Sequence, residues 1–185
     1  MDCSDNGPEP GAGRAGPFRG NKTQLFEGGI RSPLVVWAPK LMAPGKAGVR
    51  NDASVFAGID LAPSLAALAG AKPDATLDGE DLSTTLLGRA EASHRAPLCW
   101  SRPPDRKTWP PALPDPAPDL AIRDGDWKLL CDYDGSKPHL YDLKRDPGET
   151  NDLAQAEPNT VERLTKAVLA WHRSMPPDSG PALGK

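Results

Sequence analysis

Residues 26–38 read Phe26-Glu27-Gly28-Gly29-Ile30-Arg31-Ser32-Pro33-Leu34-Val35-Val36-Trp37-Ala38. A glycine–glycine turn leads here into a short, continuous apolar run that lies between Pro33 and Pro39. Such a run is typical of a strand buried on both faces, as in a parallel or mixed sheet covered by helices. The stretch therefore predicts an α/β fold in which residues 33–38 form a core strand.

A helix is predicted next, over residues 60–70. Asp60 suits the N-cap, Pro63 is tolerated in the first turn, and Gly70 can take the left-handed position after the last turn. Three leucines at spacings of four and three form one apolar stripe, namely Leu61, Leu65 and Leu68. A shorter helix is expected over residues 82–87. A strand followed by a helix is half of a βαβ unit.

The periodicity changes in the second half of the chain. Residues 120–123 and 127–131 have the pattern of short strands around Asp124-Gly125, which is a strong signal for a tight hairpin. Residues 139–143 and 97–100 are further strand candidates. Asn159 and Glu162 then have the spacing of a capping box, and apolar residues fall on one helical face: Val161, Leu164, Val168, Trp171 and Met175.

Antiparallel strands followed by one amphipathic helix predict a small α+β subdomain. We therefore expect two consecutive domains. The α/β part covers residues 1–93, and the antiparallel sheet with its helix covers residues 94–185. A proline-rich loop over residues 102–118 lies within the second domain.

The composition narrows the class of protein. The 185 residues carry a net charge of -3, which argues against a nucleic-acid partner or an anionic membrane surface. No apolar run approaches the roughly 20 residues that span a bilayer. The three cysteines show no CxxC spacing, so a zinc site or disulfide framework is not expected, and Cys99 and Cys131 are predicted to be buried. Met1-Asp2-Cys3 leads into a polar loop without an apolar leader, so the sequence indicates no compartment.

Polar residues near the start of the chain have the chemistry of an ion site. Asp5 and Asn6 offer carboxylate and amide oxygens, which hard metal ions prefer, and Lys22 offers a point positive charge for an anion. Each feature also has an ordinary structural interpretation. Asp-Asn-Gly is common in turns, a lone lysine is usually solvated, and Glu27 and Arg31 can pair four residues apart.

The order of the motifs resembles that of the sulfatases, within the alkaline phosphatase superfamily. The resemblance rests on Asp5-Asn6-Gly7, on Arg19-Gly20-Asn21-Lys22 and on Glu27-Gly28-Gly29-Ile30-Arg31-Ser32-Pro33. It continues through residues 60–70 and 77–82, and through residues 121–129 and 140–153. It covers roughly residues 3 to 175 and is weakest over residues 102–118. The resemblance implies the end of the sulfatase mixed-sheet core, followed by a C-terminal α+β subdomain.

The resemblance also implies roles for individual residues. Asp5 and Asn6 would complete a Ca²⁺ or Mg²⁺ site, and Lys22 would contact the sulfate ester. Loop scaffolding is the expected role of five further residues: Arg19, Glu27, Gly28, Gly29 and Arg31. Asn21 and Thr23 flank Lys22 where sulfatases often have glycine, which puts the loop conformation in question. Specificity comes from loops around the pocket, and the rim candidates are Trp100, Arg102 and Trp109.

The sulfatase nucleophile is a formylglycine made from Cys or Ser in a Cys/Ser-x-Pro-x-Arg motif. Cys3, Cys99 and Cys131 do not fit this motif, so the formylglycine is expected upstream of this chain, in a missing N-terminal half of the same enzyme. The histidines match none of the catalytic ones; we expect His139 to pack in a strand and His172 to lie on a helix surface. The chain alone is therefore predicted to be inactive.

Two other hypotheses remain open from the sequence. A phosphodiesterase or phosphonate hydrolase of the same superfamily is one, although such enzymes more often pair Asp with His at the metal than Asp with Asn. A non-catalytic, partner-binding module is the other. The sulfatase resemblance implies an aryl or carbohydrate sulfate as substrate, and the parent family is often periplasmic, secreted or lysosomal.

Overall fold

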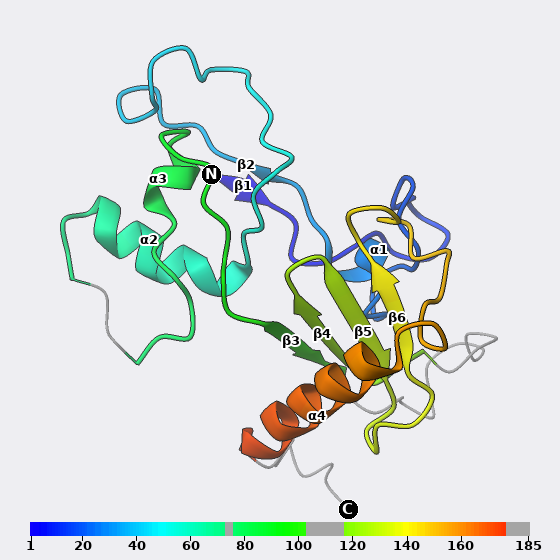
Figure 1. Ribbon diagram of the computed structural model, residues 1–185. Coiled ribbons are helices and arrows are strands. Elements are labelled where there is room, and N and C mark those ends of the chain that lie inside the picture. Colours follow the sequence, from blue (N-terminus) through cyan, green and yellow to red (C-terminus); the bar gives the residue numbers. More distant parts are fainter. Residues whose placement is uncertain (73–75, 103–116, 177–185) are drawn as a thin grey trace, which may run out of the picture. The chain divides into compact units, whose positions relative to one another are not determined.

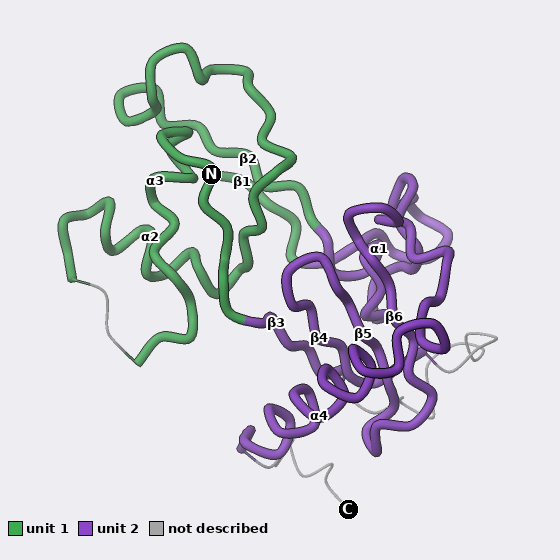
Figure 2. The backbone as a smooth tube through the Cα atoms, in the orientation of Figure 1, with its two compact units in different colours: residues 1–5, 32–96 green, residues 6–31, 97–185 purple. Residues whose placement is uncertain are grey.

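A computed structural model describes residues 1–72, 76–102 and 117–176 of the chain. Two compact units are present (Figure 2): residues 1–5 with 32–96, and residues 6–31 with 97–185. This division differs from the expected pair of consecutive domains, because residues 6–31 belong with the C-terminal sheet. The physical reason is that Leu25 and Phe26 are buried in one apolar cluster with residues of that sheet.

The second unit is built on a four-stranded antiparallel sheet (Figure 1). Its strands, in spatial as in sequence order, are β3 (Leu98–Ser101), β4 (Leu120–Asp124), β5 (Trp127–Cys131) and β6 (His139–Asp142). Gly125 has φ +61° in the turn between β4 and β5, where Asp124 pairs with Trp127. A left-handed backbone favours glycine, so the Asp-Gly signal correctly predicted the hairpin.

One long helix, α4 (Pro158–Ser174), covers one face of this sheet. Leu164 and Val168 on the helix are fully buried against strand residues that include Ile122 and Leu129. The predicted amphipathic helix is confirmed, but the capping prediction is wrong. Glu157 occupies the N-cap and no side chain caps the helix there. Pro158 stands in the first turn, where its fixed φ suits a helix start and its missing N–H costs nothing.

The opposite face of the sheet carries residues 6–31. Leu25 and Phe26 of this segment pack with sheet residues to form the second apolar cluster, whose other members are Ala121, Leu130, Tyr141 and Leu143. A single-turn helix, α1 (Glu27–Ile30), follows directly. Because neighbouring residues of a strand point to opposite faces, Leu129 faces α4 and Leu130 faces this segment. The sheet is therefore buried on both sides.

The first unit contains shorter elements. A two-residue strand, β1 (Asp2–Cys3), pairs antiparallel with β2 (Leu34–Val35). After them come η1 (Gly58–Asp60), α2 (Leu61–Leu68) and α3 (Ser83–Leu86). Gly70 has φ +74°, as predicted for the residue after α2. Among the described residues, no helix is long and apolar enough to cross a membrane.

The prediction of a strand buried on both faces over residues 33–38 is wrong for this structure. Only Leu34 and Val35 are assigned to a strand, and β1 is its partner in the two-stranded sheet. Val35 is 59% exposed and Trp37 is 79% exposed. The apolar run shows what the residues favour, whereas burial also requires neighbouring elements on each face, and a two-residue partner strand does not provide them.

Candidate active-site segment

Lys22 lies in the segment that packs on the sheet of the second unit. Its backbone N–H donates to the Pro8 carbonyl at 3.0 Å, and its Nζ lies 3.3 Å from Oε2 of Glu9. Both side chains are about half exposed, so the ion pair is weak. Thr23 has φ +79°, a conformation that favours glycine. The backbone after Lys22 therefore adopts a glycine-like conformation without a glycine.

Asn6 and Gly7 form a turn against α1. The Asn6 Nδ2 group donates to the Gly7 carbonyl at 3.3 Å, and the Gly7 N–H donates to the Gly29 carbonyl at 2.8 Å. A Cβ atom on Gly7 would lie 1.8 Å from the Gly28 carbonyl oxygen. Only glycine fits such a close approach of two backbones. The glycine of the Asp-Asn-Gly motif is thus required by packing.

The donor chemistry of Asp5 and Asn6 fits a hard cation. A carboxylate and an amide oxygen are ligands that Ca²⁺ accepts, and Ca²⁺ takes about six to eight oxygens. Within the part of the chain that the structure describes, no group of three or more His, Cys, Asp or Glu residues is placed to hold a metal ion. A cation site that includes this pair would need further oxygen ligands besides these two residues.

Close packing also explains the glycine pair of α1. A Cβ atom on Gly28 would lie 2.4 Å from the carbonyl oxygens of Arg19 and Gly20, and one on Gly29 would lie 2.0 Å from that of Gln24. The Gly28 N–H donates to the Arg19 carbonyl at 2.6 Å. The two glycines let the 19–24 loop pack directly on α1.

Two arginines of the segment stack on its aromatic rings. The guanidinium of Arg19 lies 4.0 Å from the ring centroid of Phe26, and that of Arg31 lies 4.5 Å from the ring centroid of Phe18. Arg31 also lies 3.8 Å from Oε2 of Glu27, the pair that the i, i+4 spacing suggested. These contacts are internal to the segment.

A buried ion-pair triad ties α1 to the sheet. Lys128 Nζ lies 2.9 Å from Oε1 of Glu27 and 2.9 Å from Oε1 of Glu149, and these side chains are almost completely buried. The Glu27 N–H donates to Oε2 of Glu149 at 2.6 Å. Burial raises the pKa of Glu149, while the Lys128 ammonium opposes the shift. Buried charges need such partners because their desolvation is costly.

Sequence reasoning missed Lys128 and Glu149 as partners of Glu27. One signal was present: Lys128 stands in a predicted strand and alternates with Leu130, so both should face the same buried surface. A lysine at an inward position implies a carboxylate nearby. The spacing of residues did not identify that carboxylate, because Glu27 is 101 residues away.

The first unit holds a second buried polar cluster, around Asp60. Its Oδ1 accepts from the Glu80 N–H at 2.8 Å and lies 2.8 Å from Nδ1 of His94, while its Oδ2 accepts from the Ala57 N–H at 2.8 Å. Asp60 and the His94 side chain are at most 1% exposed. Asp60 occupies the N-cap position of α2, but its side chain makes no capping hydrogen bond to that helix. The predicted capping role of the Asp60 side chain is therefore wrong.

The remaining histidines are not gathered into a site. His139 lies on β6 with Nδ1 2.7 Å from Oδ2 of Asp152, and both side chains are 40% exposed. The His172 ring on α4 lies 5.2 Å from the ring of Tyr133. Both positions are explained by local pairing and packing.

Two cysteines are poor nucleophiles in this environment. Burial raises the pKa of Cys99 to about 11 and that of Cys131 to about 12, the latter aided by nearby aspartates. Both thiols therefore stay protonated near neutral pH, and the thiolate is the reactive form. Cys3 is exposed.

The three residues predicted at the rim of the pocket differ in their surroundings. Trp100 lies on β3 and is partly buried against the cluster that contains Tyr141. Arg102 is buried, and its Nη2 donates to the Ala117 carbonyl at 2.8 Å and to Oδ1 of Asp119 at 3.3 Å. Arg102 therefore ties the end of β3 to the residues just before β4, and its side chain is not exposed at a rim. Trp109 lies outside the described residues.

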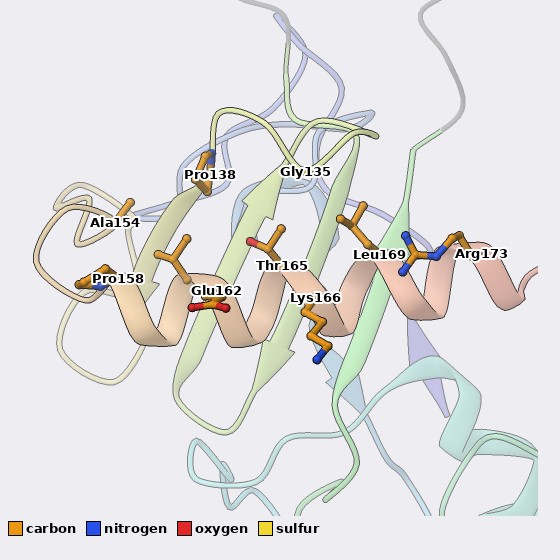
Figure 3. A pocket seen from close by; sticks show the side chains of 10 residues that line it. Gly135, Pro138, Ala154, Pro158, Glu162, Thr165, Lys166, Leu169 and Arg173 are labelled. Atoms are coloured by element: carbon orange, nitrogen blue, oxygen red, sulfur yellow. The ribbon is translucent and has the colours of Figure 1, made fainter.

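The surface also has a shallow groove along α4 (Figure 3). It contains none of the predicted site residues. Its lining comes from the helix and from the loops before and after β6: Gly135, Pro138, Ala154, Pro158, Val161, Glu162, Thr165, Lys166, Leu169 and Arg173.

Comparisons with known proteins agree with this organisation. The sequence profile of a family described as N-sulphoglucosamine sulphohydrolase, C-terminal, matches residues 18–173. Arylsulfatase A from Homo sapiens is 32% identical, and the match covers 90% of this chain and 36% of that protein. An N-acetylgalactosamine-6-O-sulfatase from Bacteroides thetaiotaomicron is 30% identical and covers 83% of this chain and 29% of its own length.

A solved structure is similar to this chain over most of its length. The crystal structure of Ps i-CgsB in complex with k-i-k-neocarrahexaose superposes with a TM-score of 0.70 at 26% identity and covers 91% of this chain and 35% of that one. The chain thus spans about a third of the length of the relatives that it matches. Its motifs, its C-terminal sheet with α4 and these matches agree, and the chain belongs to the sulfatase family, of which it represents the C-terminal portion.

Proposed function

We propose that this chain is the part of a sulfuric ester hydrolase that contributes Lys22 to sulfate binding. The observation that carries the proposal is the half-exposed side chain of Lys22, held on a segment that is itself fixed to the sheet. An ammonium beside a sulfate would stabilise negative charge that builds on its oxygens during S–O cleavage. Glu9 now pairs with Lys22 and would be displaced by the ester.

In this proposal Asp5 and Asn6 would hold a divalent cation, Ca²⁺ or Mg²⁺. When bound, the cation would supply Lewis-acid stabilisation of the sulfate oxygens. The formylglycine nucleophile and the other ligands would lie in an upstream portion of the same enzyme. The substrate class is a sulfated glycan or aryl sulfate. The complex of Ps i-CgsB with k-i-k-neocarrahexaose supports the glycan class by similarity.

The decisive experiment compares two forms of the protein. The purified 185-residue chain should give no turnover of 4-nitrophenyl sulfate, whereas the chain joined to the coding sequence upstream of Met1 should hydrolyse it. In that longer form Lys22→Ala should lower kcat/KM by about 10²–10³-fold, the size typical of losing one charge-stabilising contact. Steady-state kinetics measures both.

The matched control is Lys144→Ala, which removes an exposed lysine from the turn after β6. It should leave kcat/KM unchanged. Turnover by the 185-residue chain alone, or equal effects of the two substitutions, would reject the proposal. A longer form that cleaves bis-4-nitrophenyl phosphate but no sulfate ester would favour the phosphodiesterase alternative instead.

We also propose the upstream portion as the partner of the first unit. Nearly all the exposed large apolar side chains among the described residues belong to that unit, including Val35, Trp37 and Leu65. Exposed apolar residues that adjoin one another, as Val35 and Trp37 do two positions apart along the chain, can mark interaction surfaces. The 185-residue chain should therefore bind the dye ANS and associate with itself, and the upstream portion added in trans should suppress both effects. Equal dye fluorescence with and without that portion would contradict the proposed contact.

A further inference from the structure

The Glu27–Lys128–Glu149 triad joins three parts of the second unit that are far apart in sequence. Glu27 begins α1, Lys128 lies on β5, and Glu149 ends a second turn after β6, in which its N–H donates to the Asp146 carbonyl. Glu149 has φ +54°, an uncommon conformation for a residue other than glycine. Such a conformation persists only where the surroundings hold it, and here both its carboxylate oxygens are used by the other two members.

The Glu149 turn also holds the loop before α1. Arg19 Nη1 donates to the Tyr141 hydroxyl at 3.0 Å and to the Glu149 carbonyl at 3.4 Å. The Arg19 carbonyl in turn accepts from the Gly28 N–H. The turn therefore contacts the segment on both sides of Lys22, through Arg19 before it and Glu27 after it.

A continuous series of contacts links the triad to Lys22. Two residues after Glu27, the Gly29 carbonyl accepts from the Gly7 N–H at 2.8 Å. The residue after Gly7 is Pro8, whose carbonyl accepts from the Lys22 N–H at 3.0 Å. Both contacts are backbone hydrogen bonds of normal length. Displacing α1 would therefore displace the turn that carries Lys22.

We infer that Lys128 and Glu149 are positioning residues, which fix α1 on the sheet and thereby fix the place of Lys22. The inference rests on the proposed role of Lys22 in sulfate binding. Neither residue touches substrate in this scheme, because both are buried beneath the segment. They act through Glu27 and the backbone contacts described above.

The charge balance of the triad gives the inference a specific test. Lys128→Met keeps the volume but leaves two buried carboxylates without their shared cation. The double substitution Lys128→Met with Glu149→Gln leaves only Glu27, which has Arg31 at 3.8 Å as a remaining partner. A role in charge balance predicts that the second substitution rescues the first, whereas a role in packing alone predicts no rescue.

Hydrogen exchange on the 185-residue chain measures the positioning directly. Lys128→Met should lower the protection of the Gly7, Lys22 and Gly28 amides by about 100-fold, since breaking a buried pair is strongly destabilising. Amides of β4 and β5 should keep most of their protection. In the double variant, the protection of these amides should be at least about tenfold higher than in Lys128→Met alone. The control Lys137→Met removes an exposed lysine that pairs with Asp132 at 2.8 Å and should change none of these amides.

Kinetics of the longer form separate this inference from the proposed function. Lys128→Met should lower kcat, with partial recovery in the double variant, in parallel with the protection of the Lys22 amide. Equal loss of protection across the whole second unit, or no rescue by Glu149→Gln, would overturn the positioning role. If Lys22→Ala has no kinetic effect while the rescue in hydrogen exchange is observed, the proposed function fails and the positioning of the segment stands.

Discussion

Gly29→Ala is expected to release residues 6–31 from the sheet of the second unit. The new Cβ atom would lie 2.0 Å from the Gln24 carbonyl oxygen and 2.5 Å from that of Asn21. Both neighbours are backbone atoms of the loop that carries Lys22, so no side-chain rotation relieves the overlap. We expect the free energy of unfolding to fall by about 4 kcal/mol or more, at the upper end of single substitutions. Urea denaturation followed by circular dichroism measures this change.

A matched glycine provides the control for this substitution. Gly58 lies in η1, and a Cβ atom there would meet no heavy atom within 4 Å. Gly58→Ala should change the free energy of unfolding by no more than about 0.5 kcal/mol. If Gly29→Ala were as well tolerated as Gly58→Ala, the close packing of the 19–24 loop on α1 would be wrong.

Asp60→Ala should destabilise the first unit by about 3 kcal/mol or more, because it leaves two or three buried donors unsatisfied at about 1–3 kcal/mol each. The substitution removes the acceptor for two backbone N–H groups and the partner of the buried His94 ring. Unsatisfied buried donors cost free energy because they lose their bonds to water and gain none in return. Hydrogen exchange should show the loss at the Ala57 and Glu80 amides, which donate to this carboxylate.

Asp81→Ala is the control for Asp60. Its Oδ1 accepts from the Ser83 N–H at 2.9 Å at the surface, two residues away. Because water can replace that bond, the cost should stay near 1 kcal/mol or below, on the order of a lost helix cap. Similar effects of the two substitutions would show that the network around Asp60 contributes little to stability.

Local sequence patterns predicted the elements of the second unit well. The Asp124-Gly125 hairpin and the helix with Leu164 and Val168 on its buried face are present as expected. These patterns succeed because turn conformation and helical periodicity depend on residues within one or two turns of each other. The capping box at Asn159 failed because Pro158 already sets the helix start one residue earlier.

The prediction for residues 33–38 failed for a different reason. The apolar run correctly indicates side chains that favour burial, but Trp37 is 79% exposed. Burial depends on which elements lie against the strand, and no property of the six residues specifies those elements. The order of the motifs, in contrast, was sufficient to indicate the family, because each motif is a local pattern that can be recognised along the chain.

The sequence alone determined the sulfatase family, the hairpin and the amphipathic helix, and it identified Lys22, Asp5 and Asn6 as candidates. Tertiary structure decided that residues 6–31 lie on the C-terminal sheet and that Glu27 meets Lys128 and Glu149, which are 101 and 122 residues away. Periodicity and spacing describe neighbours along the chain. The partner of a buried charge is set by which distant segments pack together, and that information appears only when the chain is folded.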